Sequence, residues 1–282
     1  MINIFSNFSD VQMDFDSTSL NILLHDCLSR RFPSEDIEKF HIEVDPSAKI
    51  PLNSIELTYD VSWPMNIILH EESLKMYNKV FIFLLSVKQA LWSLLKIDAN
   101  ELSQTLKLEM VSEDSEIVEE TLEEKEMKLH RIVLLRSWLL HFISNIHDYF
   151  MTRVVQSTQI DLEVSLVECT DLDSILNVHD QYISKIYNRC FLHPSASLLK
   201  ETVFKVLKSA MVLHKYCTQY VQDPKAGVFI METSALKSLE ENYAKRHQFL
   251  ATTLKSMTEK RHVPHLDGLA AALLHSCPSV VV

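Results

Sequence analysis

The sequence predicts an all-α fold, a multi-helix bundle with a short extended ribbon near its N-terminal side. Only two of the 282 residues are glycine. Tight turns depend on glycine's access to positive φ, so a chain this poor in glycine favours helices joined by plain loops. Apolar residues also recur at helical spacing through most of the chain, whereas strict alternation is confined to two short runs, at 40–44 and 55–61. Together these patterns predict helices with one small ribbon.

We expect three parts along the chain. Residues 1–39 form an N-terminal segment, partly disordered, with one helix that starts near Ser17 and ends before Phe32-Pro33. Residues 40–276 form the main domain, which contains an acidic loop at 112–126, and residues 277–282 form a tail. The first helix carries one apolar face made of Leu20, Leu23, Leu24, Cys27 and Leu28.

The two alternating runs are predicted to pair as the ribbon. Trp63 follows in extended geometry, because Pro64 disfavours α geometry at the residue before it. A helix from about 71 to 96 comes next and has two apolar stripes. The first stripe comprises Leu74, Tyr77, Phe81, Leu84, Leu85, Leu91 and Leu95, and the second comprises Val80, Phe83, Val87, Ala90 and Leu94. A helix that is apolar on two sides should be sandwiched between neighbours.

The sequence of the second half of the chain predicts five further helices. One extends from about 123 to 157, and the next starts at a capping box of Thr170 and Asp173 and ends before His193-Pro194. Helices at about 198–220 and 233–260 flank a loop at 223–227, and a short helix follows Pro264.

Charge and composition restrict the possible partners. The net charge is −11, but residues 113–126 hold eight acidic residues and one lysine, a net −7, which leaves −4 for the rest. The absence of a Lys/Arg stripe argues against nucleic acid or an anionic membrane as partner. Apolar runs stay short of the ~20 residues of a membrane span, so no membrane insertion is predicted. Five scattered cysteines fit a reducing cytoplasm.

We find no sign of an enzyme, a cofactor or a metal site. The glycines are too far apart for a phosphate-binding loop. Ser195 follows His193-Pro194 with no glycine or acid near it, which indicates a structural turn. His262 and His265 could join only Cys277, too few ligands for zinc.

Four segments, taken in order, resemble the C-terminal domain of the gamma-tubulin complex component family. The first is Tyr59-Asp60-Val61-Ser62-Trp63-Pro64, which is followed by Tyr77-Asn78 and Phe81-Ile82-Phe83-Leu84-Leu85. The others are LLRSWLLHFISNIHDYFMTRVVQST (134–158) and DLDSILNVHDQYISKIYNRCFL (171–192). The resemblance covers about residues 40–275. Within the family, YFMTRVVQST, DLDSILNVHDQYISKIYNRC and PHLDGLAAALLH favour one particular member.

This resemblance implies an all-helical gamma-tubulin-binding domain of a ring complex that templates microtubule nucleation. It also implies partners, gamma-tubulin and other gamma-tubulin complex components, and a location in the cytoplasm and cytoskeleton at a centrosome or spindle pole. GTP would belong to gamma-tubulin. Full-length members carry a preceding domain for lateral contacts, so we expect a C-terminal fragment or short isoform. The alternative is a helical tethering or trafficking scaffold that does not bind gamma-tubulin.

Two groups of residues are candidates for the site. The partner-facing candidates are Glu56, Thr58, Tyr59, Asp60 and Asn66, since the extended run offers a strand edge and polar side chains. The resemblance marks the structural candidates Trp63, Pro64, Tyr77, Asn78, Phe81, His179 and Tyr182. For Trp63 we weigh a contact with the partner against packing in the bundle, and favour packing. For His179 we expect a satisfied core histidine rather than a ligand.

Overall fold

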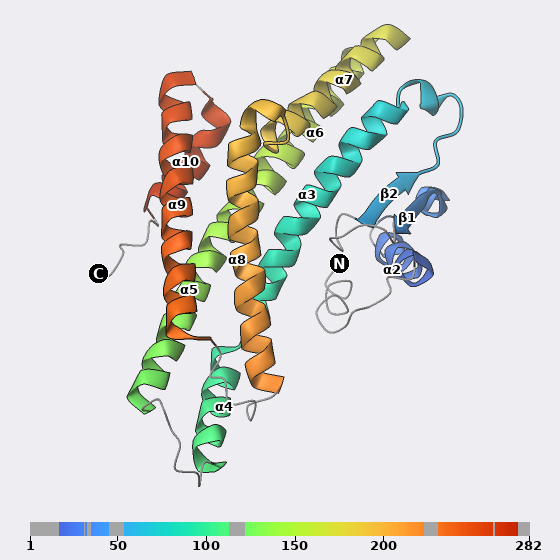
Figure 1. Ribbon diagram of the computed structural model, residues 1–282. Helices are drawn as coiled ribbons and strands as arrows, with labels where there is room; N and C mark the ends of the chain where they lie inside the picture. Colours follow the sequence, from blue (N-terminus) through green and yellow to red (C-terminus); the bar gives the residue numbers. More distant parts are fainter. Residues whose placement is uncertain are drawn as a thin grey trace. The chain divides into compact units, whose positions relative to one another are not determined.

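The computed structural model describes residues 17–30, 32, 35–44, 54–112, 122–222, 231–261 and 263–275 (Figure 1). These residues confirm the predicted all-α class with one small two-stranded sheet. They divide into two compact units, one of residues 1–89 and 150–197 and the other of residues 90–149 and 198–282. The boundaries between the units fall within the continuous helix α3 (Glu71–Leu95), after Tyr149 and after Ser197.

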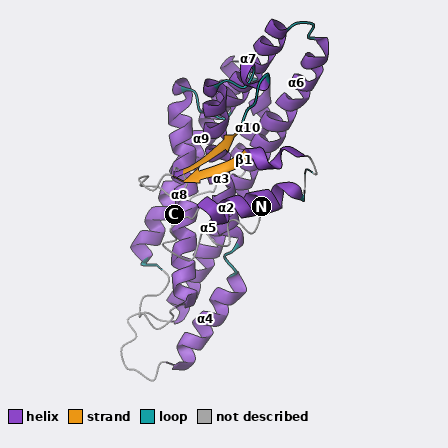
Figure 2. Ribbon diagram, turned by 90° about the vertical axis from the view of Figure 1, so that its right-hand side faces the viewer, coloured by secondary structure: helices purple, strands orange, loops and turns teal. Residues whose placement is uncertain are grey.

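The first unit begins with α2 (Ser17–Ser29), which packs on β1 (Phe40–Val44). β1 pairs antiparallel with β2 (Ile55–Tyr59), and Ile42 lies opposite Leu57, which confirms the predicted ribbon (Figure 2). Leu20, Ile42 and Ile55 form a small buried core. Half-buried Leu24, Val44, Leu57, Phe81 and Leu85 pack against it. The ribbon thus shares a core with α2 and α3.

Helix α3 buries only one of its two predicted stripes. The stripe of Val80, Phe83, Val87, Ala90 and Leu94 is at most 6% exposed at every position. The other stripe is half-buried, and its last residue, Leu95, is 58% exposed. The prediction of a fully sandwiched helix is therefore correct for one stripe only.

Length and composition alone would also allow α3 to cross a membrane. An 18-residue window of this 25-residue helix has a mean hydropathy of 1.2, although polar residues such as Lys79 and Lys88 interrupt its apolar runs. Core helices of soluble proteins share these properties, and a third of that window is buried within the protein. The observation therefore carries no further conclusion about a membrane.

The predicted helix at 123–157 is longer and less regular than expected. α5 (Leu122–Asp148) passes into a π-helical segment, Tyr149–Gln156, which continues directly as α6 (Ser157–Glu168). The acidic segment expected as a loop at 112–126 is helical at both ends. α4 (Ala99–Ser112) includes residue 112, and α5 includes residues 122–126. Residues 113–121 lie outside the described part, and so does the loop at 223–227. The helix α4 was not predicted.

α7 (Leu172–Arg189) starts one residue later than expected. The capping box is formed by Asp171 and Ser174 rather than by Thr170 and Asp173. Asp171 Oδ1 accepts from the Ser174 backbone N–H at 2.7 Å, and the Asp171 N–H lies 3.4 Å from the Ser174 hydroxyl. The Asp171 carboxylate is a better N-cap than the Thr170 hydroxyl, because its negative charge also interacts favourably with the positive end of the helix dipole. α6 and α7 pack side by side (Figure 2).

The second unit is built from α4, α5, α8 (Ser197–Gln222), α9 (Thr233–Arg261) and α10 (Asp267–His275). α9 and α10 lie alongside each other (Figure 1). Arg131 of α5 forms a bidentate ion pair with Glu240 of α9, at 2.6 and 3.1 Å. The Tyr243 hydroxyl donates to the Trp138 carbonyl at 3.0 Å. The predicted helices of this half are thus confirmed, and polar contacts join α5 to α9.

Candidate functional site: the turn after strand β2

The turn that follows β2 exposes an unusual amount of apolar surface. Trp63 is 78% exposed, and Met65 and Ile67, in the 3-10 turn Met65–Ile67, are 48% and 43% exposed. The expectation that Trp63 packs in the bundle is therefore wrong. The core beneath the ribbon is built from side chains of α2, the two strands and α3, and Trp63 is not among them.

The predicted partner-facing residues divide into an exposed group and a group whose side chains contact the ribbon. Asp60 and Asn66 are exposed beside Trp63 in the sequence, and Asp60 pairs with His41 at 3.3 Å. Glu56 is exposed on β2. Half-buried Thr58 donates to the His41 carbonyl at 3.2 Å, and the Tyr59 ring lies 4.6 Å from that of Phe40. Thr58 and Tyr59 therefore serve the ribbon itself.

We define the Trp-Pro surface as Asp60, Trp63, Met65, Asn66 and Ile67. Sequence reasoning missed Met65 and Ile67 as contact candidates. The signal was present, since two apolar residues directly follow Trp63-Pro64 in a turn with no helical spacing to bury them. An exposed tryptophan beside two further apolar side chains and a polar rim is typical of a protein-binding patch.

Both outer edges of the ribbon carry side-chain partners at their midpoint. Asn21 Oδ1 accepts from the Ile42 N–H at 2.6 Å, and its amide donates to the Ile42 carbonyl at 3.0 Å. On the other edge, Asn78 Oδ1 accepts from the Leu57 N–H at 3.2 Å. A strand added by a partner would have to displace Asn78, which disfavours the predicted use of this edge.

Two more signature residues connect α3 to α7. The Tyr77 hydroxyl lies 3.1 Å from His179 Nε2, and the two rings are 5.9 Å apart. His179 is 6% exposed, and this burial lowers the pKa of its imidazole. Burial likewise raises the pKa values of Tyr77 and of half-buried Tyr182. His179 is buried as expected, but it is not a fully satisfied core histidine, because its buried Nδ1 has no hydrogen-bond partner among the described residues. Phe81 packs against the ribbon core.

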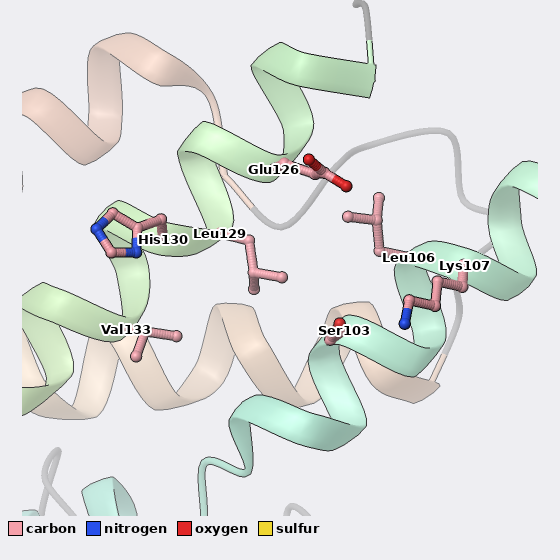
Figure 3. A pocket seen from close by; sticks show the side chains of 7 residues that line it. All are labelled: Ser103, Leu106, Lys107, Glu126, Leu129, His130 and Val133. Atoms are coloured by element: carbon pink, nitrogen blue, oxygen red, sulfur yellow. The ribbon is translucent and has the colours of Figure 1, made fainter.

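A separate pocket of about 300 Å³ lies between α4 and α5 of the second unit. Leu106 and Leu129 point toward this space from the two helices (Figure 3). Ser103, Lys107, Glu126, His130 and Val133 complete the lining. Nothing in this arrangement pairs a nucleophile with a base, so it gives no argument for a reaction.

Within the described ranges, no three His, Cys, Asp or Glu side chains come together as metal ligands. Of the weighed zinc ligands, His262 and Cys277 lie outside those ranges. His265 stacks on Tyr149, with ring centroids 6.4 Å apart.

The comparisons with known proteins agree with the sequence resemblance. The family model "Gamma tubulin complex component C-terminal" matches residues 11–274. Gamma-tubulin complex component 5 of Mus musculus is 30% identical over 268 residues, which cover 90% of this chain and 26% of the relative. The same component of Macaca fascicularis is 31% identical, with 90% and 36% covered. Spindle pole body component 98 of Dictyostelium discoideum is 31% identical over 55% of this chain and 18% of its own length.

Component 5 is the family member that the three quoted segments favour, and the first two relatives agree with that prediction. The chain spans about a quarter to a third of the length of these relatives.

Proposed function

This chain belongs to the gamma-tubulin complex component family, and from that premise we propose that it binds gamma-tubulin and positions it for microtubule nucleation. Membership supports a role in the gamma-tubulin complex and association with other components of that complex. We further propose that the role is structural and not catalytic, and that α3 is a core helix, not a membrane span.

The Trp-Pro surface is the observation that carries this proposal. Its indole is 78% exposed, in the unit whose sequence holds the family's Trp-Pro and Tyr-Asn signatures. Tryptophan contributes large contact area with few rotamers to immobilise, so it is enriched among the residues that dominate binding energy. Asp60 and Asn66 would form the polar rim around Trp63, Met65 and Ile67.

The mechanism we propose is positional. A microtubule nucleus forms slowly because several subunits must lose translational and rotational freedom before their contacts compensate for that loss. A scaffold that holds gamma-tubulin at a fixed place removes part of this entropic cost in advance. Asn78 and Tyr77 support such a role, since they tie the ribbon and α7 to α3 beneath the binding turn. GTP would be held by gamma-tubulin.

The location proposed here is the cytoplasm, at a microtubule-organising centre such as a centrosome or spindle pole. The relatives support a cytoskeletal location in general, because they are named as gamma-tubulin complex and spindle pole body components.

Co-precipitation of the purified chain with gamma-tubulin, with alpha/beta-tubulin as a control, tests the proposal. We expect enrichment of gamma-tubulin only, and a loss of at least about tenfold in affinity for Trp63→Ala with Met65→Ala. Met127→Ala is the matched control, since Met127 is 67% exposed on α5. A wild-type chain that fails to enrich gamma-tubulin would contradict the proposal and favour the tethering scaffold instead.

A further inference from the structure

Helix α6 carries an apolar stripe that is exposed among the residues the structure describes. Ile160, Val164 and Val167 are 54%, 59% and 86% exposed. At 100° per residue, positions i, i+4 and i+7 fall within a sector of about 60° on one side of the helix. Three aliphatic side chains thus line up over two helical turns, a length of about 10 Å.

The stripe is not needed for the packing of α6. The buried residue Thr158 and the half-buried residues Leu162, Ser165 and Cys169 lie on the opposite side of the helix. On the flank, Asp161 pairs with Lys185 of α7 at 2.5 Å. The inward side of α6 is thus a mixed one, with two hydroxyl residues among its four positions, and the apolar stripe lies on the outward side.

The surroundings of the stripe are acidic. Three acidic residues of α6 lie near the stripe, Asp161, Glu163 and Glu168, and of these Asp161 is paired with Lys185 of α7. Helical spacing places Glu163 on one side of the stripe and Glu168 on the other, and both are exposed. Anionic lipid headgroups would be repelled by these carboxylates, whereas a basic protein segment would be attracted.

We propose that the α6 stripe is a docking site for a basic amphipathic helix of another protein. Its apolar residues at i, i+4 and i+7 would pack along Ile160, Val164 and Val167, and Lys or Arg beside them would meet Glu163 and Glu168. The site is separate from the Trp-Pro surface and does not depend on the proposed binding of gamma-tubulin.

Fluorescence anisotropy with a labelled helical peptide of about 18 residues tests this proposal. The peptide carries Leu at i, i+4, i+7 and i+11 with flanking Lys and Arg, and a second peptide replaces these basic residues by Glu. We expect the full chain to bind the basic peptide at least tenfold more tightly than the acidic one. Glu163→Lys with Glu168→Lys should reverse that preference, and Val164→Gln with Val167→Gln should weaken the basic peptide at least tenfold.

Glu101→Lys with Glu201→Lys is the matched control, because it changes the net charge equally at exposed residues of α4 and α8. It should leave the affinity within twofold of wild type. Unchanged binding in the Val164/Val167 variant would overturn the proposal, since the peptide would then respond to charge alone. A second outcome would also overturn the proposal. If the wild type fails to bind the peptide but forms concentration-dependent dimers in light scattering, and the Val164/Val167 variant does not form them, the stripe binds a second copy of the chain.

Measuring gamma-tubulin capture by the variants of both surfaces distinguishes the α6 docking site from the proposed gamma-tubulin site. The α6 variants should retain capture, whereas Trp63→Ala with Met65→Ala should lose it and still bind the basic peptide. Loss of capture in the α6 variants would make the stripe part of the gamma-tubulin surface and would contradict a separate site.

Discussion

Asn78 of α3 accepts a hydrogen bond from the backbone N–H of Leu57 at the midpoint of β2, at 3.2 Å. The adjacent residue, Tyr77, reaches His179 of α7. Two neighbours in the sequence thus hold two different elements against the same helix. The Tyr-Asn pair of the family signature is therefore structural in this chain, and it fixes the strand from which the Trp-Pro surface extends.

Asn78→Ala should loosen the ribbon edge. The Leu57 N–H would lose its acceptor, at an expected cost of about 1 kcal/mol in the free energy of unfolding. The amide of Leu57 should also exchange faster with solvent, as measured by hydrogen-exchange NMR or mass spectrometry. Asn66→Ala, at an exposed position of the same unit, is the control and should leave both quantities unchanged. Slow exchange at Leu57 in the Asn78 variant would contradict the edge-capping role.

Tyr77→Phe should destabilise the contact between α3 and α7. The substitution keeps the ring but leaves His179 Nε2 buried without its partner, a change that costs about 1–3 kcal/mol. Urea unfolding measures the loss. A double-mutant cycle with His179→Leu should return a coupling of at least about 0.5 kcal/mol, since the two residues are in contact. Additive effects in the cycle would show that the hydroxyl and the imidazole act independently.

Asp171→Ala should fray the start of α7, because Asp171 accepts from the backbone N–H of Ser174 and that hydrogen bond lowers the pKa of its carboxyl group. Faster exchange of the Ser174 amide is the expected result. Thr170→Ala, one residue earlier, should change nothing. If Thr170→Ala frayed the helix instead, Thr170 would be the N-cap, as the sequence alone predicts.

Sequence patterns located most helices because their buried residues repeat at helical spacing. The second stripe of α3 is the clearest case, since all five of its residues are buried. Helix ends were less predictable. Just beyond the end of α7, Phe191 has a φ of 59°, in the left-handed region where glycine is usual, and the Leu192 N–H donates to the Tyr187 carbonyl. A chain without glycine there gives no signal for such a cap, and burial of the Phe191 ring compensates its strain.

The exposure of the candidate site residues was predictable only in part. The Trp-Pro segment was identified, yet Trp63 was expected to pack and Thr58 and Tyr59 to face a partner. Whether an aromatic residue in a short connector is buried depends on the space left by distant residues such as Leu20 and Phe81, and no local pattern records that space. The side-chain caps on the ribbon edges are equally non-local, since Asn21 and Asn78 each lie 21 residues from the strand residue they bind.

Acid should destabilise the second unit through His247. This side chain is fully buried in α9, beside the rings of Phe142 and Tyr243. Burial, followed by the nearby His141, lowers the pKa of its imidazole from 6.5 to about 4. Between these values the unfolded chain binds a proton that the native protein does not, so stability falls as pH decreases from about 6.5 to about 4. The loss is on the order of 3 kcal/mol.

His247→Phe, which keeps an aromatic ring without a titratable group, should flatten this pH dependence. Urea unfolding midpoints at pH 7 and pH 5 provide the measurement. His275→Phe, at an exposed residue, is the control and should keep the wild-type slope. An unaltered slope in the His247 variant would assign the acid sensitivity to other groups.

Capture of gamma-tubulin should depend little on salt. Outside residues 113–126 the net charge is only −4, and Asp60 is the one charged member of the Trp-Pro surface. A contact built on Trp63, Met65 and Ile67 gains little from long-range attraction, so the affinity should change less than about twofold between about 50 and 300 mM salt. The basic peptide on α6 should weaken at least tenfold over the same range and serves as the internal control. A comparable collapse of gamma-tubulin capture would show that charge, and not the apolar turn, dominates that interface.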